Sequence, residues 1–375
     1  MPASLRIGKI GGIEVFIHWS WLLIFVLLTW LFATGILDRF YPGWSAGQRW
    51  LAGAIVSFVF FLSLLLHELA HSLLARRRGI EVREITLFFL GGVSNLRGEP
   101  RTAKDEFAIA IVGPLTSLLL GAIFAAGWAI LRYWSAGIAG ISAQLAVINA
   151  TLAAFNMLPG FPLDGGRVFR ALVWRRNNNL LAATRSASRL GEISAYGLMG
   201  IGVVMLFFGL LIDGIWFFII GMFLRGASVS SYQQMLVQVT LSGVTAAEAA
   251  SKDCQPVAPD ISLQQLVDNY VLAHSARCFP VQTGGEELIG LITLDDVRKV
   301  PRDQWPSTSV FKTMTPSERL HTVPPHEDLQ HVMQIMGEAD VNQVPVVEGR
   351  QLVGMVSRAD ILRLIQIRRE LADHG

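Results

Sequence analysis

Long stretches without charged side chains restrict the fold of this 375-residue chain more than any other feature. A helix needs about 20 largely apolar residues to cross a bilayer. Only 16% of the residues are charged, against about 25% in an average soluble protein. The sequence therefore excludes a protein that is soluble throughout, and it predicts about six membrane spans. We expect these spans at residues 16–37, 51–66, 107–131, 133–163, 193–212 and 214–224, the last continuing to about Gln233.

The charges divide the chain into two parts of opposite sign. Residues 236–375 carry 30 of the 60 charged side chains and have a net charge of −6, whereas residues 1–235 have a net charge of +8. We therefore expect a membrane domain over residues 1–235, followed by an acidic soluble tail. The total net charge of +2 gives no reason to expect nucleic acid as a partner.

The distribution of Lys and Arg predicts the orientation of the spans. Basic residues cluster before the first span, after the second and after the fourth, whereas the loops on the opposite side hold only three arginines. The clusters are Arg6 and Lys9, then Arg76, Arg77 and Arg78, then Arg167, Arg170, Arg175, Arg176, Arg185 and Arg189. Because cytoplasmic loops carry the excess of Lys and Arg, we expect a multi-pass protein of the cell membrane with both termini in the cytoplasm.

Residues 81–96, between the second and third spans, have the composition of a small β-hairpin. Val82, Ile85, Leu87 and Phe89 suggest strand residues, and the Gly91-Gly92 pair suggests the turn. An ordinary cytoplasmic loop is the alternative interpretation.

The second span runs directly into the pattern His67-Glu68-Leu69-Ala70-His71. On a helix, residues i and i+4 share a face, so His67 and His71 can bind one metal ion while Glu68 lies beside them as a general base. Chance placement on a solvated helix is the alternative. Ionisable groups inside a membrane are costly and are usually functional, which favours the metal site.

A catalytic zinc ion usually takes three protein ligands, and Asp164 is the best candidate for the third. It ends the long apolar run of the fourth span, after Pro159 and Pro162, which cannot continue a helix. A broken helix end of this kind can carry a carboxylate inward against protein or a wet cavity. The alternative interpretation is that Asp164 lies in a loop that closes the helix at the membrane interface. His18, beside Trp19 and Trp21, fits an interfacial or core histidine better than a ligand.

A charge count supports this set of ligands. The charge of one Zn²⁺ per chain is balanced by Asp164 and Glu68, with both histidines neutral, so the site suits a low-dielectric environment. Glu68 would take a proton from water and pass it to the leaving amine. The amide of Asn156 could donate to the oxyanion, or it could satisfy backbone groups freed by Pro159. We expect Asn149 to be structural.

These motifs together resemble the site-2 protease family of intramembrane zinc metalloproteases. The resemblance rests on H-E-L-A-H at 67–71, Gly113-Pro114, and F-N-M-L-P-G-F-P-L-D-G-G-R at 155–167. It implies His67, His71 and Asp164 as metal ligands, Glu68 as catalytic base and Asn156 near the scissile carbonyl. It also implies that the Gly91-Gly92 hairpin holds substrate as an added strand. Without a PDZ-like insertion, the chain resembles the sporulation-type subgroup, which carries a C-terminal regulatory module.

The tail contains an internal repeat. Phe279-Pro-Val281 recurs as Val344-Pro-Val346, and residues 288–297 recur as 352–361. Each unit reads helix, strand, turn, strand, helix. The pattern resembles a tandem pair of α/β CBS domains, with boundaries that we place at 236–306 and 307–375.

The resemblance to CBS domains also implies nucleotide-binding residues. In that family Thr293, Asp296, Ser357 and Asp360 would contact the ribose of an adenine nucleotide, ATP or AMP. The alternative is that Thr293 and Ser357 are N-caps of helices that contain the aspartates. Cys254 and Cys278 are too few for a disulfide scaffold.

The sequence thus predicts a regulated intramembrane protease that hydrolyses a peptide bond in or near a transmembrane segment. The expected partners are a single-span membrane-protein substrate, the lipid bilayer, an adenine nucleotide and a second copy of the chain bound through the CBS domains. Two alternatives are a channel or transporter gated by the CBS pair, and a membrane scaffold whose site is inactive.

Overall fold

The computed structural model describes residues 4–373 except 89–90, 252–253, 275–276 and 285–286, and it leaves the side chains of residues 93–97, 274, 369 and 371–373 undescribed. The chain forms two compact units, Met1–Met235 and Leu236–Gly375. The strands of the first unit are β1 (Ser4–Ile10), β2 (Ile13–His18), β3 (Glu81–Phe88) and β4 (Gly91–Arg97). Its helices are α1 (Ser20–Leu31), α2 (Leu37–Phe40), α3 (Ala46–Arg77), α4 (Ala103–Leu131), α5 (Ala136–Asn156), α6 (Asp164–Asn177), α7 (Leu180–Phe207) and α8 (Leu211–Leu241), and a π-helical turn, Phe32–Ile36, joins α1 to α2.

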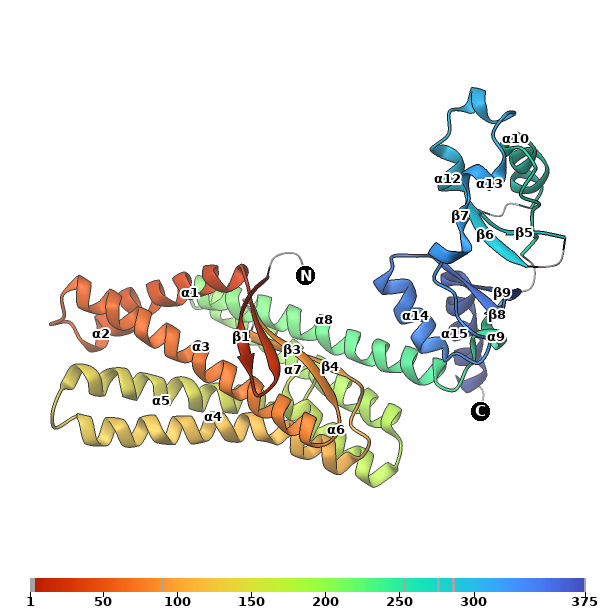
Figure 1. The fold of residues 1–375 in the computed structure, drawn as a ribbon. Helices are drawn as coiled ribbons and strands as arrows, with labels where there is room; N and C mark the ends of the chain where they lie inside the picture. Colours follow the sequence, from red (N-terminus) through yellow and green to blue (C-terminus); the bar gives the residue numbers. More distant parts are fainter. Residues whose placement is uncertain (1–3, 89–90, 252–253, 275–276, 285–286, 374–375) are drawn as a thin grey trace. The chain divides into compact units, whose positions relative to one another are not determined.

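Six helices are long and apolar enough to cross a membrane, as the sequence predicts. They are Ser20–Phe40, α3, α4, α5, α7 and α8. Large apolar side chains such as Leu22, Ile123 and Phe207 are exposed on them, at 60%, 55% and 88%. Such exposure suits a hydrocarbon environment, where apolar surface carries no cost. Figure 1 shows α4 and α5 side by side, joined by a short loop.

The boundaries of several spans differ from those predicted. The first span begins at Ser20, because residues 16–18 belong to β2. The fourth helix ends at Asn156, and the chain to Leu163 is not helical. The fifth ends at Phe207 rather than Ile212, because the chain turns at Gly209, whose φ is +78°. Hydropathy indicates burial or lipid contact but not backbone conformation. It therefore could not distinguish apolar residues in a helix from those in a strand, loop or turn.

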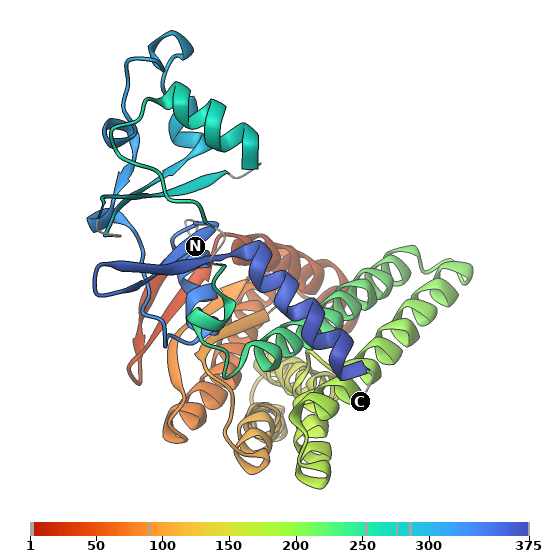
Figure 2. The same cartoon turned by 90° about the vertical axis from the view of Figure 1, so that its right-hand side faces the viewer.

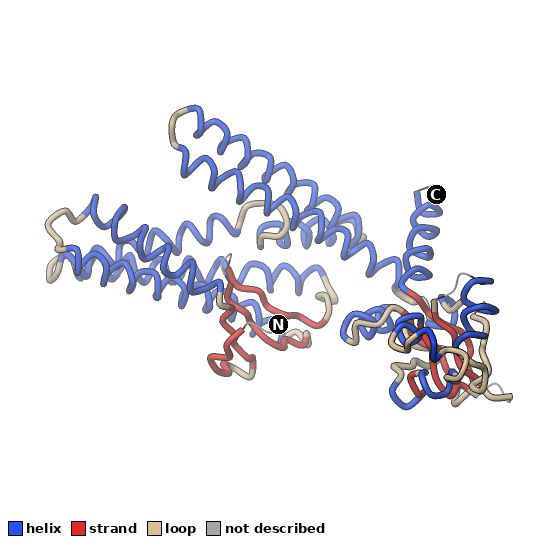
Figure 3. Tube along the Cα trace, turned by 90° about the horizontal axis from the view of Figure 1, so that it is seen from above, coloured by secondary structure: helices blue, strands red, loops and turns tan. Residues whose placement is uncertain are grey.

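A four-stranded sheet covers the histidine-bearing part of α3. Its order is β1-β2-β3-β4, and β2 pairs with β3 in parallel. Ile13 of β2 and Ile85 of β3 are fully buried in one apolar cluster with Leu69 of α3 and Ile109 of α4. The sheet is therefore anchored beside the H-E-x-x-H turn of α3, and Figure 3 shows its strands gathered on one side of the long helices.

The hairpin of β3 and β4 confirms the predicted strands but not the predicted turn. Gly91 pairs with Phe88 and Gly92 pairs with Leu87, so both glycines lie within β4. Phe89, which we expect in a strand, lies outside the described residues. The sequence also gave no sign of β1 and β2, because their few apolar residues merge with the first span.

The second unit contains two repeats of strand, turn, strand and helix. The first repeat contains β5 (Cys278–Gln282), β6 (Leu288–Thr293) and α12 (Leu294–Arg298), and the second contains α14 (Leu329–Glu338), β8 (Gln343–Glu348), β9 (Gln351–Ser357) and α15 (Arg358–Asp373). Short elements complete the unit: α9 (Ala246–Ala249), α10 (Leu263–Leu266), α11 (Leu272–His274), α13 (Val310–Thr313) and β7 (Thr315–Pro316). Figure 2 shows α15 in dark blue at the end of the chain.

The core of each repeat contains residues that lie outside that repeat in the sequence. Leu241 and Val244, which precede the first repeat, are buried in the core of the second repeat with Val346. Val310 and Met314, which follow the first repeat, are buried in its core. Each core therefore includes residues from outside its own repeat, and both repeats belong to one compact unit.

Candidate metal centre

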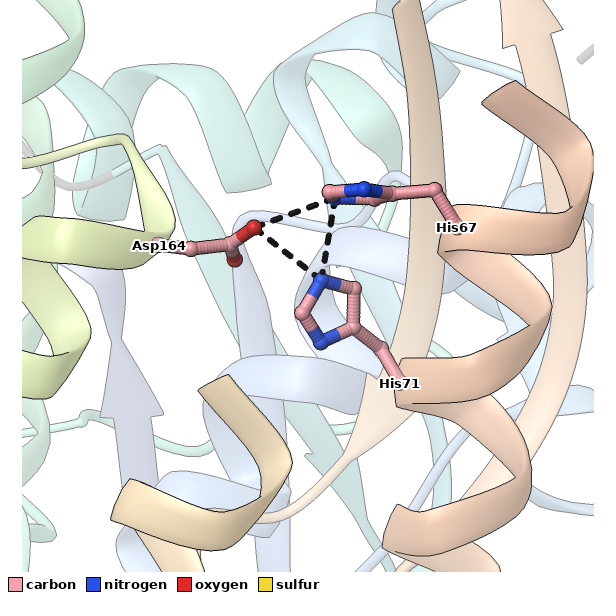
Figure 4. A group of neighbouring side chains, drawn as sticks. All are labelled: His67, His71 and Asp164. Atoms are coloured by element: carbon pink, nitrogen blue, oxygen red, sulfur yellow. Dashed lines mark hydrogen bonds and ion pairs between the residues drawn. The ribbon is translucent and has the colours of Figure 1, made fainter. Parts of the chain in front are cut away.

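Two histidines of α3 and the first residue of α6 face one another inside the membrane unit (Figure 4). His67 and His71 are one helical turn apart, and their residues are 2% and 7% exposed. Asp164 is 9% exposed. Of the described residues, only these three form a group of His, Cys, Asp or Glu side chains whose donor atoms lie within 4.8 Å of one another.

The three donor atoms form a nearly equilateral triangle. Oδ2 of Asp164 lies 3.1 Å from Nε2 of His67 and 3.1 Å from Nε2 of His71. The two Nε2 atoms lie 3.2 Å apart. Zinc bonds of about 2.0–2.1 Å in tetrahedral geometry place ligand atoms about 3.3 Å apart. The triangle therefore has nearly the size of one face of a zinc coordination tetrahedron.

The hydrogen bonds of the opposite ring nitrogens fix which nitrogen faces the centre. Nδ1 of His71 lies 2.6 Å from the carbonyl oxygen of Ile109. A carbonyl only accepts, so Nδ1 carries the proton, and Nε2 of the neutral ring presents a lone pair toward Asp164. Nδ1 of His67 lies 2.9 Å from Oγ of Ser117. Metal-binding histidines are usually oriented by a partner on their other nitrogen in this way.

Helix α4 comes unusually close to both imidazoles. A Cβ atom at Gly113 would collide with Nε2 of His71 and lie 2.7 Å from Nε2 of His67. Gly113, Ile109 and Ser117 follow at four-residue intervals and therefore share one face of α4. This face supplies both Nδ1 partners. The resemblance above includes Gly113, but the sequence alone gave no sign of the partner roles of Ser117 and Ile109.

A buried ion pair ties α6 to α4 next to the centre. Nε of Arg170 donates to Oε1 of Glu106 at 2.6 Å, and its Nη2 lies 3.0 Å from Oε2 of Glu99. Glu106 is fully buried and Arg170 is 5% exposed. Removing one partner of a buried pair is strongly destabilising. The pair therefore helps to hold α6, which begins with Asp164, against the helix that orients the histidines.

The other predicted residues of the centre lie at its edge or away from it. Glu68 is half-buried, and a Cβ at Gly92 of β4 would collide with its Cγ. Asn156 is the last residue of α5, and its amide donates to the carbonyl of Leu152 at 3.0 Å. His18 pairs with Oγ of Ser20 at 2.8 Å and does not belong to the triangle.

Asn149 has the structural role that we expect. It is fully buried, and its amide donates to the carbonyl of Leu145 on α5 at 2.9 Å and to Oγ of Ser63 on α3 at 3.3 Å. It therefore links α5 to α3.

In the tail, Thr293 and Asp296 form a capping box at the start of α12 and line a cavity of about 680 Å³. Burial raises the pKa of Asp296, but hydrogen bonds from Lys299 and Thr293 outweigh it and hold the pKa below its usual value. The same cavity is lined by the cationic side chains Arg277, Arg298, Lys299 and Arg319. The carboxylates of Asp295 and Asp340 line it as well. Such a mixture of three carboxylates and four cations can accept a hydroxylated, phosphorylated ligand.

Ser357 and Asp360 repeat this capping arrangement in the second repeat. The hydroxyl of Ser357 donates to the carboxylate of Asp360, and the backbone N–H of Asp360 donates back to that hydroxyl at 3.1 Å. Neither residue lines the 680 Å³ cavity or a second one of about 610 Å³ beside Arg350. Of the two residue pairs predicted to bind nucleotide, Thr293 and Asp296 therefore line one of these two cavities, and Ser357 and Asp360 line neither.

Comparison with known proteins identifies both parts of the chain. Peptidase family M50 matches residues 55–133 and 129–194, and the CBS domain matches residues 246–303 and 310–367. The "Putative zinc metalloprotease Rip3" of Mycobacterium tuberculosis is 35% identical over 98% of this chain and 94% of its own length. A zinc metalloprotease of Methanocaldococcus jannaschii is 27% identical over 100% of both chains.

A solved structure also matches the chain. The site-2 protease from Methanocaldococcus jannaschii covers 61% of this chain and 95% of its own, with 28% identity and a TM-score of 0.43.

We predict that Gly113→Ala weakens metal binding, because the added methyl group occupies the space of the two imidazole rings. Loss of one correctly placed ligand or its support typically lowers metal affinity about 10–100-fold. Gly127→Ala on the same helix is the control, since its Cβ would meet only the side chain of Ser142, at ordinary distances of 3.5 and 3.9 Å. Zinc titration of both purified variants checks this, and equal affinities would contradict the packing described here.

Proposed function

This chain belongs to peptidase family M50, and from that membership we propose that His67, His71 and Asp164 bind one zinc ion with which it cleaves a transmembrane substrate. The chain is a multi-pass zinc metalloprotease of the site-2 type with a tandem CBS pair. This excludes the channel or transporter as its primary function. The substrate that we propose is a single-span membrane protein, cut in or near its transmembrane segment.

The convergence of three buried acceptor atoms is the observation that carries this proposal. Two imidazole nitrogens and a carboxylate oxygen lie within 3.2 Å of one another, so one metal ion can take a lone pair from each of them. Zinc charge would be balanced by Asp164 and Glu68, which leaves a neutral set inside the membrane. All the ligands required for activity are present, which argues against an inactive scaffold.

The residues around the centre divide the chemistry among them. A zinc ion in this site would polarise the scissile carbonyl and lower the pKa of water. Glu68, between the two histidines in sequence, takes the proton of the attacking water and delivers it to the leaving amide nitrogen. Asn156 donates to the developing oxyanion once its amide leaves the carbonyl of Leu152.

We predict that Glu68→Gln keeps the zinc ion but lowers the cleavage rate by about 10²–10⁴-fold, the usual contribution of a general base. Gln is nearly isosteric with Glu but cannot accept the proton. Asp164→Ala should instead lose zinc. Metal analysis and a cleavage assay on both purified variants separate the two roles. Substantial turnover by Glu68→Gln, or full zinc occupancy in Asp164→Ala, would remove that residue from its assigned role.

We further propose that the substrate binds as an added strand on β4. Among the strands that the structure describes, β3 is the only neighbour of β4, so one edge of β4 is available for pairing. Gly92 of this strand packs directly against Glu68. A transmembrane helix must unwind before its peptide bond becomes accessible, and an extended strand on β4 would hold it in the unwound form beside the base.

This mode predicts crosslinks between substrate and position 93 in β4, through a photoreactive amino acid placed there. The side chain of Val93 itself lies outside the described residues. Position 7 in β1, at the opposite edge of the sheet, is the matched control, because Ile7 is also exposed, at 55%. We expect crosslinks from position 93 and none from position 7. Crosslinks confined to α7 and α8 would refute strand addition.

For the tail we propose a regulatory role in the cytoplasm, where both termini would lie by the positive-inside rule. An adenine nucleotide in the 680 Å³ cavity would place its ribose hydroxyls on Asp296 and its phosphates on the surrounding cations. Ser357 and Asp360 are the corresponding candidates in the second repeat. Association of two chains through the CBS domains stays a prediction.

We predict that ATP or AMP binds the isolated tail, residues 236–375, and that Asp296→Asn weakens binding about tenfold or more, as loss of a charged hydrogen bond does. Asp360→Asn is the comparison, because that residue does not line the cavity. Calorimetry measures both. An equal loss in the two variants would add the second repeat to the site, and no heat at millimolar nucleotide would reject nucleotide binding.

A further inference from the structure

The loop from Met157 to Leu163, which ends immediately before Asp164, is held from both sides through the backbone of one residue, Phe161. The N–H of Phe161 donates to the carbonyl of Ala187 on α7 at 3.3 Å. The carbonyl of Phe161 accepts a hydrogen bond from Oγ of Ser228 on α8. Ser228 is fully buried. The segment that leads into Asp164 is therefore hydrogen-bonded to α8, a helix that supplies none of the three donor atoms.

The backbone around Phe161 is closely packed. A Cβ at Gly191 of α7 would collide with the carbonyl oxygen of Phe161 and with Oγ of Ser228. A Cβ at Gly160 would collide with the backbone of Gly191, and a Cβ at Gly166 with the backbone of Gly160. The loop, α6 and α7 thus pack backbone against backbone, and a hydroxyl at position 228 completes the contact.

Ser228 differs from the serine one turn further along α8. The hydroxyl of Ser231 donates to the carbonyl of Ala227 on the same helix at 2.9 Å, which is the usual local solution for a serine in a membrane helix. Ser228 instead directs its hydrogen bond to another segment, three residues before Asp164. A buried polar contact whose partners are all hydrogen-bonded rigidifies the segments that it joins.

We propose that Ser228 is a positioning residue for the metal ligand Asp164 and that it acts through the carbonyl of Phe161. The proposal rests on the ligand role assigned to Asp164 above. Removing the hydroxyl leaves the Phe161 carbonyl without its donor, so the loop relaxes and the Asp164 carboxylate leaves the triangle with His67 and His71. Ser228 supplies none of the three donor atoms of the centre.

The test compares zinc affinity in the full-length protein with the alanine, cysteine and control variants. Competition with a chelator measures the zinc dissociation constant of wild type, Ser228→Ala, Ser228→Cys and Ser231→Ala. We expect Ser228→Ala to bind zinc about tenfold more weakly, the lower end for an outer partner of a ligand. Ser228→Cys, which keeps a weak donor, should fall in between, and Ser231→Ala should match wild type.

Steady-state kinetics distinguish a positioning role from a general loss of stability. Ser228→Ala should lower kcat with KM unchanged, and added zinc should restore part of the loss. Wild-type zinc affinity in Ser228→Ala would overturn the proposal while leaving the zinc site intact. An equal loss in Ser231→Ala would also overturn it, because the effect would then belong to α8 packing. Absence of zinc from the wild-type protein would instead refute the proposed function itself.

Discussion

Three electron-pair donors that converge inside an apolar unit are the constraint on which the rest of the membrane domain depends. Nε2 of His67, Nε2 of His71 and Oδ2 of Asp164 lie 3.1–3.2 Å apart. The Asp164 carboxylate is paired with both imidazoles, and further contacts of the polypeptide hold the three side chains in this arrangement. Helix geometry supplies the first part, because residues 67 and 71 share one face of α3.

The remaining part comes from two further helices. α4 approaches through Gly113 and fixes both rings through Ser117 and the carbonyl of Ile109. α6 is held on one side by the buried Glu106–Arg170 pair. On the other side, the loop that precedes α6 is hydrogen-bonded to α8 through the carbonyl of Phe161. Buried polar contacts of this kind add little net stability, but they exclude alternative packings. These contacts therefore hold the three donor atoms in one arrangement.

The sequence alone predicted the parts of this arrangement that have a local pattern. The spacing of the two histidines and a carboxylate at the end of an apolar run are visible within a few residues. The partner of His67 is Ser117, 50 residues away, and Ser228 is 67 residues from Phe161. No periodicity or composition marks such pairs, because they arise only when helices pack. The strands β1 and β2 were missed for a different reason: their short apolar alternation is continuous with the first span.

The most direct test of this account is anomalous diffraction at the zinc absorption edge from crystals of the active, full-length protein. The account predicts a single strong peak per chain, at about 2.0–2.2 Å from Nε2 of His67, Nε2 of His71 and a carboxylate oxygen of Asp164. A peak bound by other side chains, or a proteolytically active protein with no peak between these three residues, would contradict it.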